Sequence, residues 1–157
     1  MVSLADDLEV LEGELRELQL PHFDAGVAWT IGSFIHRRSV EAELSIAFEV
    51  SRPGQQLFLF AARGTTPDNA SWIRRKRNVV ERFHKSSLAM RLSAEHENRP
   101  LLERYALSPT DYCSSGGGVP LMVRSCGYVG TVAITGLTQL QDHALAVEAI
   151  RFAIANA

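Results

Sequence analysis

The sequence is poor in the features that mark several specialised classes of protein. Its two cysteines, Cys113 and Cys126, are too far apart for a CxxC motif and too few for a disulfide framework, which favours a reducing compartment. No apolar run approaches the ~20 residues that a membrane-spanning helix needs, and the N-terminus lacks the basic and apolar segments of a secretory signal. We therefore expect a cytoplasmic protein with no membrane partner.

The sequence also has little excess charge of either sign. Its 16 basic and 18 acidic residues leave a net charge of -2, which argues against a nucleic-acid-binding protein. The basic run at positions 74–77 is interrupted when it is wrapped on a helix, because one of its members then points inward. The histidines show neither HxxxH nor HExxH spacing, so no preformed zinc site is expected.

Length and periodicity predict one α+β domain over residues 1–157. A chain of this size can bury roughly 70% of the surface it exposes when unfolded. Apolar residues recur at helical spacing in four segments and alternate in two pairs of strands. We predict helices from a capping box at Ser3 to about Leu20, from an N-cap at Asp24, from Asn69 to about Leu92 and from a capping box at Thr138 and Gln141, and hairpins over 44–62 and 121–135. The order predicts an antiparallel sheet of four or five strands flanked by helices, in an α/β/α sandwich.

Lys76 is the residue that points most directly to a function. In the segment WIRRKRNVVERF, helical spacing places it on the apolar face with Trp72 and Phe83, while the arginines fall on the opposite side. Burial without a partner would lower the pKa of an ammonium by as much as ~3–5 units, so an anionic partner is expected. That partner is either a ligand or a structural carboxylate such as Glu49 or Glu95.

The functional interpretation is a pocket for a compact anionic metabolite around Lys76. Asn69 and Ser87 lie on the same helical stripe and would bind the ligand through hydrogen bonds. Trp72 and Phe83 would supply flat apolar walls. Gly117 and Gly118 would allow its close approach. The alternative for these glycines is a conformational turn that leads into a strand, because the segment lacks the GxxxxGK[ST] and GxGxxG patterns.

Asp142 and His143 open the last predicted helix and complete the candidate site. The positive end of a helix favours a carboxylate and disfavours an imidazolium, so we expect His143 to be neutral and available as a ligand or base. The alternative is a core histidine with both nitrogens satisfied. Ser115 has no GxSxG context and Cys113 has no activating partner, so no catalytic residue is assigned.

Two stretches of the sequence resemble a known family of small proteins. They are GTTPDNASWIRRKRNVVERFHKSS (64–87) and GGGVPLMVRSCGYVGTVAITGLTQLQDHALAVEAI (116–150). They resemble the haem-degrading-domain family, which includes HbpS-like haem-binding proteins, GlcG-like proteins and an uncharacterised branch. The resemblance implies a profilin-like sandwich that assembles into homodimers or larger rings. Ser115 stands where members of that branch tend to have a histidine before the glycines.

Three functions therefore remain open from the sequence. The first is an oligomer that binds a small anion at Lys76. The second, implied by the family, is the binding of haem as a cofactor, with or without its oxidative degradation. Within the family motif, only His143 offers an axial ligand for the iron. The third is a scaffold whose last helix and Trp72 helix form subunit contacts.

Overall fold

The computed structural model describes residues 3–157, and over that range the chain forms six helices and five strands. The helices are α1 (Leu4–Glu17), α2 (Ala25–Glu41), α3 (Pro67–Phe83), α4 (Ser87–His96), α5 (Leu101–Arg104) and α6 (Gln139–Ala155). The strands are β1 (Gln19–Leu20), β2 (Ala47–Arg52), β3 (Gln55–Ala61), β4 (Gly118–Val123) and β5 (Gly127–Thr135). The predicted α+β class is confirmed.

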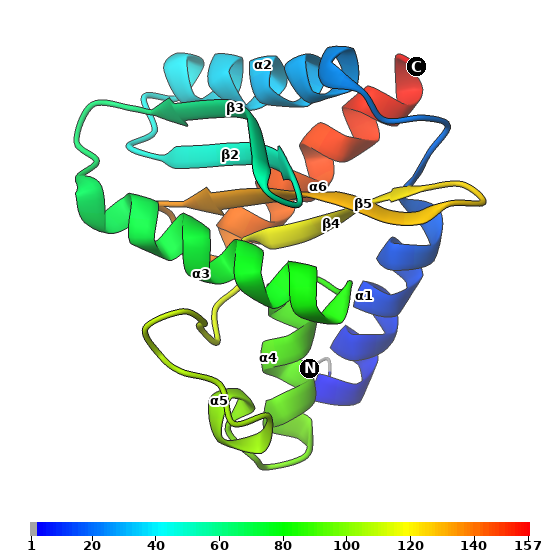
Figure 1. Ribbon diagram of the computed structural model, residues 1–157, viewed down its shortest axis with the longest axis vertical. Coiled ribbons are helices and arrows are strands. Elements are labelled where there is room, and N and C mark those ends of the chain that lie inside the picture. Colours follow the sequence, from blue (N-terminus) through cyan, green and yellow to red (C-terminus); the bar gives the residue numbers. More distant parts are fainter. Residues whose placement is uncertain (1–2) are drawn as a thin grey trace.

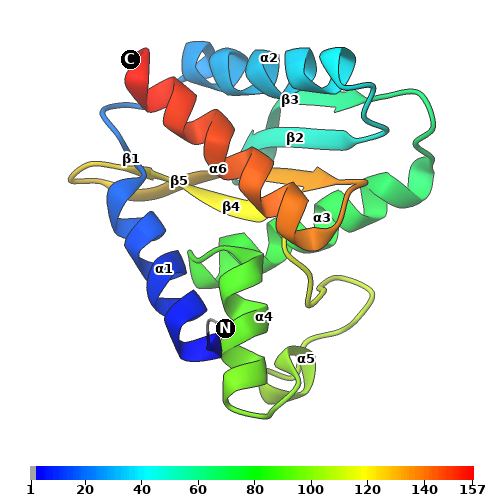
Figure 2. The same ribbon diagram turned by 180° about the vertical axis from the view of Figure 1, so that it is seen from behind.

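The five strands form one sheet between two layers of helix. Their order is β1-β4-β5-β2-β3, and every neighbouring pair is antiparallel except β1 and β4. Helices α2 and α6 cover one face of the sheet and α3 covers the other (Figures 1 and 2). The predicted α/β/α sandwich is therefore confirmed, with five strands.

The main core lies between the sheet and the α2 and α6 layer. Large side chains with no exposed surface fill it, among them Ile31 of α2, Phe48 of β2 and Ile134 of β5. Both apolar faces of α6 are covered, as the sequence predicted, because the sheet lies on one side and α2 on another. These layers hold the N-terminus of α6 fixed against the end of the sheet.

Helices α1 and α4 lie side by side beyond the β4 side of the sandwich (Figures 1 and 2). A second, smaller core forms between α3, α4 and α5, around Val79, Met90 and Leu101. None of the residues of α1 is fully buried, although Leu8, Leu11 and Leu15 are partly covered. The structure therefore has a well-packed sandwich and a more loosely packed helical part.

The predicted helix caps are confirmed. The side chain of Ser3 accepts a hydrogen bond from the backbone of Asp6, and Asp24 does the same for Val27. Thr138 and Gln141 form the reciprocal bonds of a capping box at the start of α6. Each cap satisfies a backbone donor that a helix terminus leaves unpaired.

Two predicted boundaries are wrong. The first helix ends at Glu17 rather than near Leu20, because Gln19 and Leu20 pair in parallel with β4 as a two-residue strand. The first hairpin begins at Ala47 rather than at position 44, since the N–H of Leu44 donates to the carbonyl of Ser39 at the end of α2.

The prediction that the Lys76 helix continues to about Leu92 is also wrong. His84 adopts a left-handed conformation with φ of 54°, and α3 ends before it. A new helix, α4, starts after Ser86, whose hydroxyl accepts a hydrogen bond from the N–H of Ala89. Hydroxyl side chains at such positions favour a helix start over a helix interior, which explains the break. Ser87 therefore belongs to α4 and not to the stripe of Lys76.

Candidate functional site

Lys76 is fully buried and its charge is neutralised within its own chain. Its ammonium donates to the carbonyl of Ile134 at 2.8 Å and to Oδ2 of Asp142 at 3.1 Å. The two side chains of this ion pair are only 3% and 2% exposed. Asp142 therefore takes the place of the expected ligand, and the expectation that Glu49 or Glu95 is the structural partner is wrong.

Asp142 is positioned by the start of α6. Its second oxygen, Oδ1, accepts a hydrogen bond from the N–H of Leu137 at 3.1 Å, just before the helix begins. Burial raises the pKa of Asp142 from its ordinary value of 3.8, and the Lys76 ammonium opposes that effect. A buried, hydrogen-bonded pair of this kind joins α3 to the far layer of the fold through the end of β5.

The glycine turn serves the packing of α3. Gly117 has φ of +130°, and a Cβ atom there would lie 2.5 Å from the carbonyl oxygen of Ile134 and 2.7 Å from Nζ of Lys76. A Cβ atom on Gly118 would lie 2.9 Å from a methyl group of Val80. The N–H of Gly118 donates to the hydroxyl of Ser87 at 2.9 Å. The close approach that the sequence predicted is thus made by α3 and its lysine, as in the conformational-turn interpretation.

Three other predicted site residues make their interactions elsewhere. Asn69 accepts the N–H of Thr66 at 2.9 Å in the capping box of α3. The guanidinium of Arg75 lies 4.0 Å from the ring centroid of Trp72. Phe83 packs on a tyrosine in the second core. These three residues therefore do not converge on Lys76. The predicted site residues that do converge are packed together: Lys76, Ser87, Gly117, Gly118 and Asp142.

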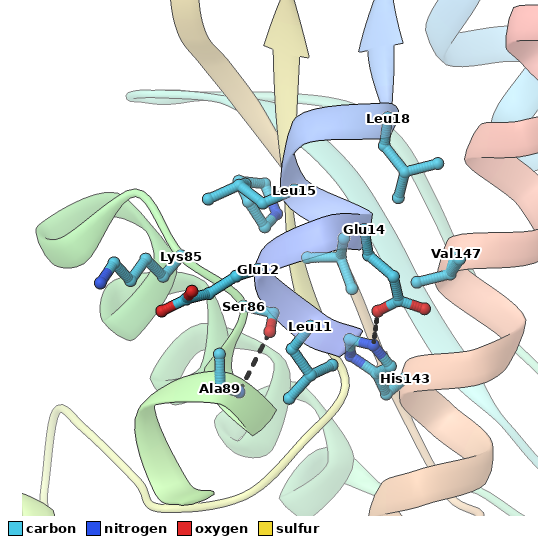
Figure 3. Close-up of a pocket in the computed structure, with 12 residues that line it drawn as sticks. Leu11, Glu12, Glu14, Leu15, Leu18, Lys85, Ser86, Ala89, His143 and Val147 are labelled. Carbon is cyan, nitrogen blue, oxygen red and sulfur yellow. Dashed lines mark hydrogen bonds and ion pairs between the residues drawn. The ribbon is translucent and has the colours of Figure 1, made fainter. Parts of the chain in front are cut away.

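A cavity lies on the other side of the start of α6, beneath α1. It has an empty volume of about 430 Å³, part of which is open to solvent. Hydrocarbon from four elements lines it, and Figure 3 labels Leu11 and Leu15 of α1, Ala89 of α4 and Val147 of α6. The fourth element, β4, contributes Val119. We call this space the α1 cavity. Glu12 and Lys85 are charged side chains that line it on the side of α1 and α4 (Figure 3).

His143 brings a polar atom to the α1 cavity. Its Nε2 lies 2.9 Å from Oε1 of Glu14, and because a carboxylate only accepts, Nε2 carries the proton of this bond (Figure 3). Within residues 3–157, its Nδ1 has no hydrogen-bond partner, although the residue is only 6% exposed. The interpretation of a core histidine with both nitrogens satisfied is wrong. In the neutral tautomer, Nδ1 is a buried acceptor without a donor.

Sequence reasoning missed Glu14 and the rest of the α1 wall. Glu14 and His143 are 129 positions apart, and neither residue type specifies the other. Leucines recur at helical spacing in α1, at Leu4, Leu8, Leu11 and Leu15, but this pattern indicates only a helix with one apolar face. What that face covers depends on the β1–β4 pairing, which no local pattern revealed.

The described part of the chain, residues 3–157, contains no group of three or more His, Cys, Asp or Glu side chains arranged to hold a metal ion. None of the helices within the same range is long and apolar enough to cross a bilayer.

Comparison with known proteins shows the family to which this chain belongs. The family described as "Haem degrading protein HbpS-like" matches residues 23–151, and the chain belongs to it. A UPF0303 protein of Serratia proteamaculans (strain 568) is 44% identical over 149 residues, covering 95% of this chain and 92% of that protein.

Two solved structures extend the comparison. The crystal structure of the Ybr137w protein has a TM-score of 0.85 and 30% sequence identity, covering 93% of this chain and 87% of that one. The crystal structure of a PduOC:Heme complex has a TM-score of 0.69 at 14% identity, covering 83% of this chain and 94% of that one, and so shows likeness of fold. The expected family and its profilin-like sandwich are confirmed.

Proposed function

We propose that this protein binds a small, mostly apolar molecule in the α1 cavity, with a hydrogen-bond donor of the ligand directed at His143. The observation that carries this proposal is the unpartnered Nδ1 of His143, a residue that lines a mostly apolar cavity. Ligand sites are commonly apolar clefts with a few placed polar groups. Leaving a buried acceptor unpaired costs about 1–3 kcal/mol, and a ligand hydroxyl or N–H would recover part of it.

This ligand differs in charge from the anionic metabolite that the sequence suggested. Lys76 is already neutralised by Asp142, so it has no charge to offer an anion. The α1 cavity has two carboxylates, Glu12 and Glu14, against one ammonium, Lys85. A ligand carboxylate would meet repulsion there, whereas an uncharged donor would not.

A matched pair of probes tests the proposal. Cyclohexanol and cyclohexanecarboxylate share an apolar ring and differ in the polar group. In ¹H–¹⁵N spectra we expect cyclohexanol to shift the amides of α1 and of the starts of α4 and α6, and the carboxylate to leave them unchanged. Shifts scattered over the surface, or equal shifts from both probes, would contradict the proposal.

A cavity-filling variant provides the control. Ala89 lines the cavity, so Ala89→Phe should occupy it and abolish the shifts caused by cyclohexanol. Ala70 lies on α3 with its side chain exposed, so Ala70→Phe adds the same ring in solvent and should leave those shifts intact. Persistence of the shifts in Ala89→Phe would place the probe outside the α1 cavity.

Haem binding is a second candidate, supported by the family and by the haem complex of the PduOC structure. The residues present do not fit a haem iron in this arrangement. Nε2 of His143 is engaged by Glu14, and Nδ1 is buried. We expect added haem to give a broad, nonspecific spectrum. A sharp Soret band that is lost in His143→Ala would instead establish haem as the ligand.

We also propose that the protein self-associates as a homo-oligomer. What supports this is exposed apolar surface on the α2 and β3 side, where Trp29, Val40 and Leu59 are 67%, 60% and 56% exposed. The contacts first expected from α6 and Trp72 are not needed, because both faces of α6 are covered within the chain and Trp72 lies beneath Arg75. A monomer by light scattering at micromolar concentration would contradict this proposal and the scaffold interpretation.

A further inference from the structure

Arg77, the residue next to Lys76, forms an ion pair between α3 and the sheet. It donates through a terminal nitrogen to Oε1 of Glu49 at 2.7 Å. The Glu49 side chain on β2 is 2% exposed, but that of Arg77 is 23% exposed. Gln56 of β3 donates to the other oxygen of the same carboxylate. The buried carboxylate is thus held from two sides by side chains that reach solvent.

A polar cavity opens where these side chains meet. It lies between the β2–β3 hairpin and the second half of α3 and has an empty volume of about 650 Å³, part of it open to solvent. We call it the hairpin cavity. Its polar lining includes Ser51, Arg52, Gln56, Arg77, Asn78 and Glu81.

Ser51 gives the hairpin cavity a buried group without a partner. The residue is 2% exposed, and its hydroxyl has no hydrogen-bond partner among residues 3–157. Most buried side-chain hydroxyls are satisfied, and an unsatisfied one carries a desolvation cost. Ser51 is among the residues that line the cavity, so its hydroxyl is a candidate partner for a molecule held there.

The other polar groups of the hairpin cavity offer both donors and acceptors. Arg77 keeps N–H groups beyond the one that Glu49 accepts, because a guanidinium has five. Gln56 and Asn78 use their amide nitrogens, toward Glu49 and toward the carbonyl of Asp111, so their amide oxygens remain as acceptors. A ligand there therefore needs donors and acceptors close together.

Charge selects against an ionic ligand. The cations Arg52 and Arg77 are matched by the anions Glu49 and Glu81, and Nε of Arg77 lies 3.9 Å from Oε1 of Glu81. Because these charges are balanced, an anion or a cation placed among them gains no net attraction to offset the hydration that it loses. Each hydroxyl of a polyhydroxyl compound is a donor and an acceptor without charge.

We propose that the hairpin cavity is a second binding site, for a small uncharged polyhydroxyl compound of the monosaccharide class, with Ser51, Arg77 and Glu81 in contact with its hydroxyls. This site lies on the α3 face of the sheet and is independent of the α1 cavity. Its success or failure therefore leaves the function proposed above unaffected.

Three sugars that share one ring test the proposal. Glucose is neutral, glucuronate is an anion and glucosamine is a cation at neutral pH. We expect glucose to shift the amides of residues 51–56 and 77–81 in ¹H–¹⁵N spectra, and the charged sugars to bind about tenfold more weakly, since an unfavourable charge contact is worth roughly 1 kcal/mol or more near a protein surface. The absence of shifts localised to these residues, or a charged sugar that binds as well as glucose, would overturn the proposal.

Variants sharpen the test. Ser51→Ala should weaken glucose binding about three- to tenfold, the effect of one hydrogen bond. Ser39 is also a buried serine, on α2, with its hydroxyl bonded to the carbonyl of His36, so Ser39→Ala should leave binding unchanged. Unchanged binding in Ser51→Ala would contradict the assigned contact.

A second variant keeps the proposal testable if Ser51→Ala does not fold. Glu81 is a helix-surface residue with a side chain 29% exposed, and Glu81→Gln removes one anion from the cavity. The variant should bind glucuronate more tightly than the unmodified protein does. An affinity for glucuronate that does not rise in Glu81→Gln would count against the proposal.

Discussion

Lys76 and Arg77 are neighbours on one helix, and each pairs with a buried carboxylate, yet they produce opposite surroundings. The Lys76–Asp142 pair is closed on both sides, with exposures of 3% and 2%. In the Arg77–Glu49 pair the carboxylate is closed off at 2%, but the arginine is 23% exposed at the edge of a cavity. In this protein, the lysine at the centre of the apolar face of α3 is closed off from any ligand, whereas the arginine at the margin of that face borders a cavity.

The chemistry of the two cations explains part of this difference. The ammonium of Lys76 is compact, and one carbonyl and one carboxylate accept hydrogen bonds from two of its three N–H groups. The guanidinium of Arg77 is a planar fork with more donors than Glu49 can accept. A lysine can complete a core, whereas an arginine in the same situation retains donors for another partner.

The largest effect is expected from Lys76→Met, which leaves Asp142 buried without its counter-charge. Loss of one partner of a buried pair typically lowers the free energy of unfolding by about 3–5 kcal/mol. Urea denaturation at pH 7 would measure it. Adding Asp142→Leu should recover much of the loss, since an apolar pair replaces an ionic one. A double variant no more stable than the single one would show that the site depends on the charges.

The cost of Lys76→Met should depend on pH. Without the ammonium, the pKa of Asp142 in the folded state rises further above 3.8, its value in the unfolded chain. A carboxyl group whose folded pKa is raised stabilises the fold below the unfolded pKa and loses that contribution as pH rises through the folded pKa. The difference from the unmodified protein should therefore be larger at pH 7 than at pH 4.5.

Arg77→Met should have a smaller effect, about 2 kcal/mol, as expected for the loss of a hydrogen bond to a charged group. Glu49 keeps its bond to Gln56, and the vacated position is reached by solvent through the hairpin cavity. The same urea titration measures the change. A loss of unfolding free energy as large as that of Lys76→Met would contradict the difference between the buried Lys76–Asp142 pair and the partly exposed Arg77–Glu49 pair.

The smallest effects separate two buried serines. Ser51→Ala removes a hydroxyl without a partner in the described chain. The free energy of unfolding of this variant should therefore fall no more than about 0.5 kcal/mol below that of the unmodified protein. Ser87→Ala removes the acceptor of the Gly118 N–H and should cost about 1–3 kcal/mol. Equal losses for both variants, measured by urea titration, would mean that Ser51 has a structural partner after all.

Much of the fold could be predicted because its signals are local. The caps at Ser3, Asp24 and Thr138 and the alternation of the strands each depend on a few adjacent residues. The break at His84 was missed because helical periodicity continues across it, while the conformation that ends the helix is uncommon for a non-glycine residue. The β1 strand was missed because two residues are too few to show a period.

The candidate sites could be predicted only in part. The sequence correctly placed Lys76 on the buried side of its helix, but not the carboxylate that neutralises it, since Asp142 comes from an element 66 positions away. Arg77 was assigned to the solvent side, although it bonds a buried glutamate. Its partner lies on the neighbouring layer, and helix geometry alone does not specify how layers are aligned.

The attachment of α1 has a consequence for how molecules enter and leave. This helix is joined to the sheet through only Gln19 and Leu20, and it has no fully buried side chain. Because its side chains are at most partly buried, its detachment would expose less apolar surface than unfolding of the sandwich, so its opening free energy should lie below that of global unfolding. Residence times in the space that it covers would then follow the local unfolding of α1, and its amides should exchange with deuterium sooner than those of α6.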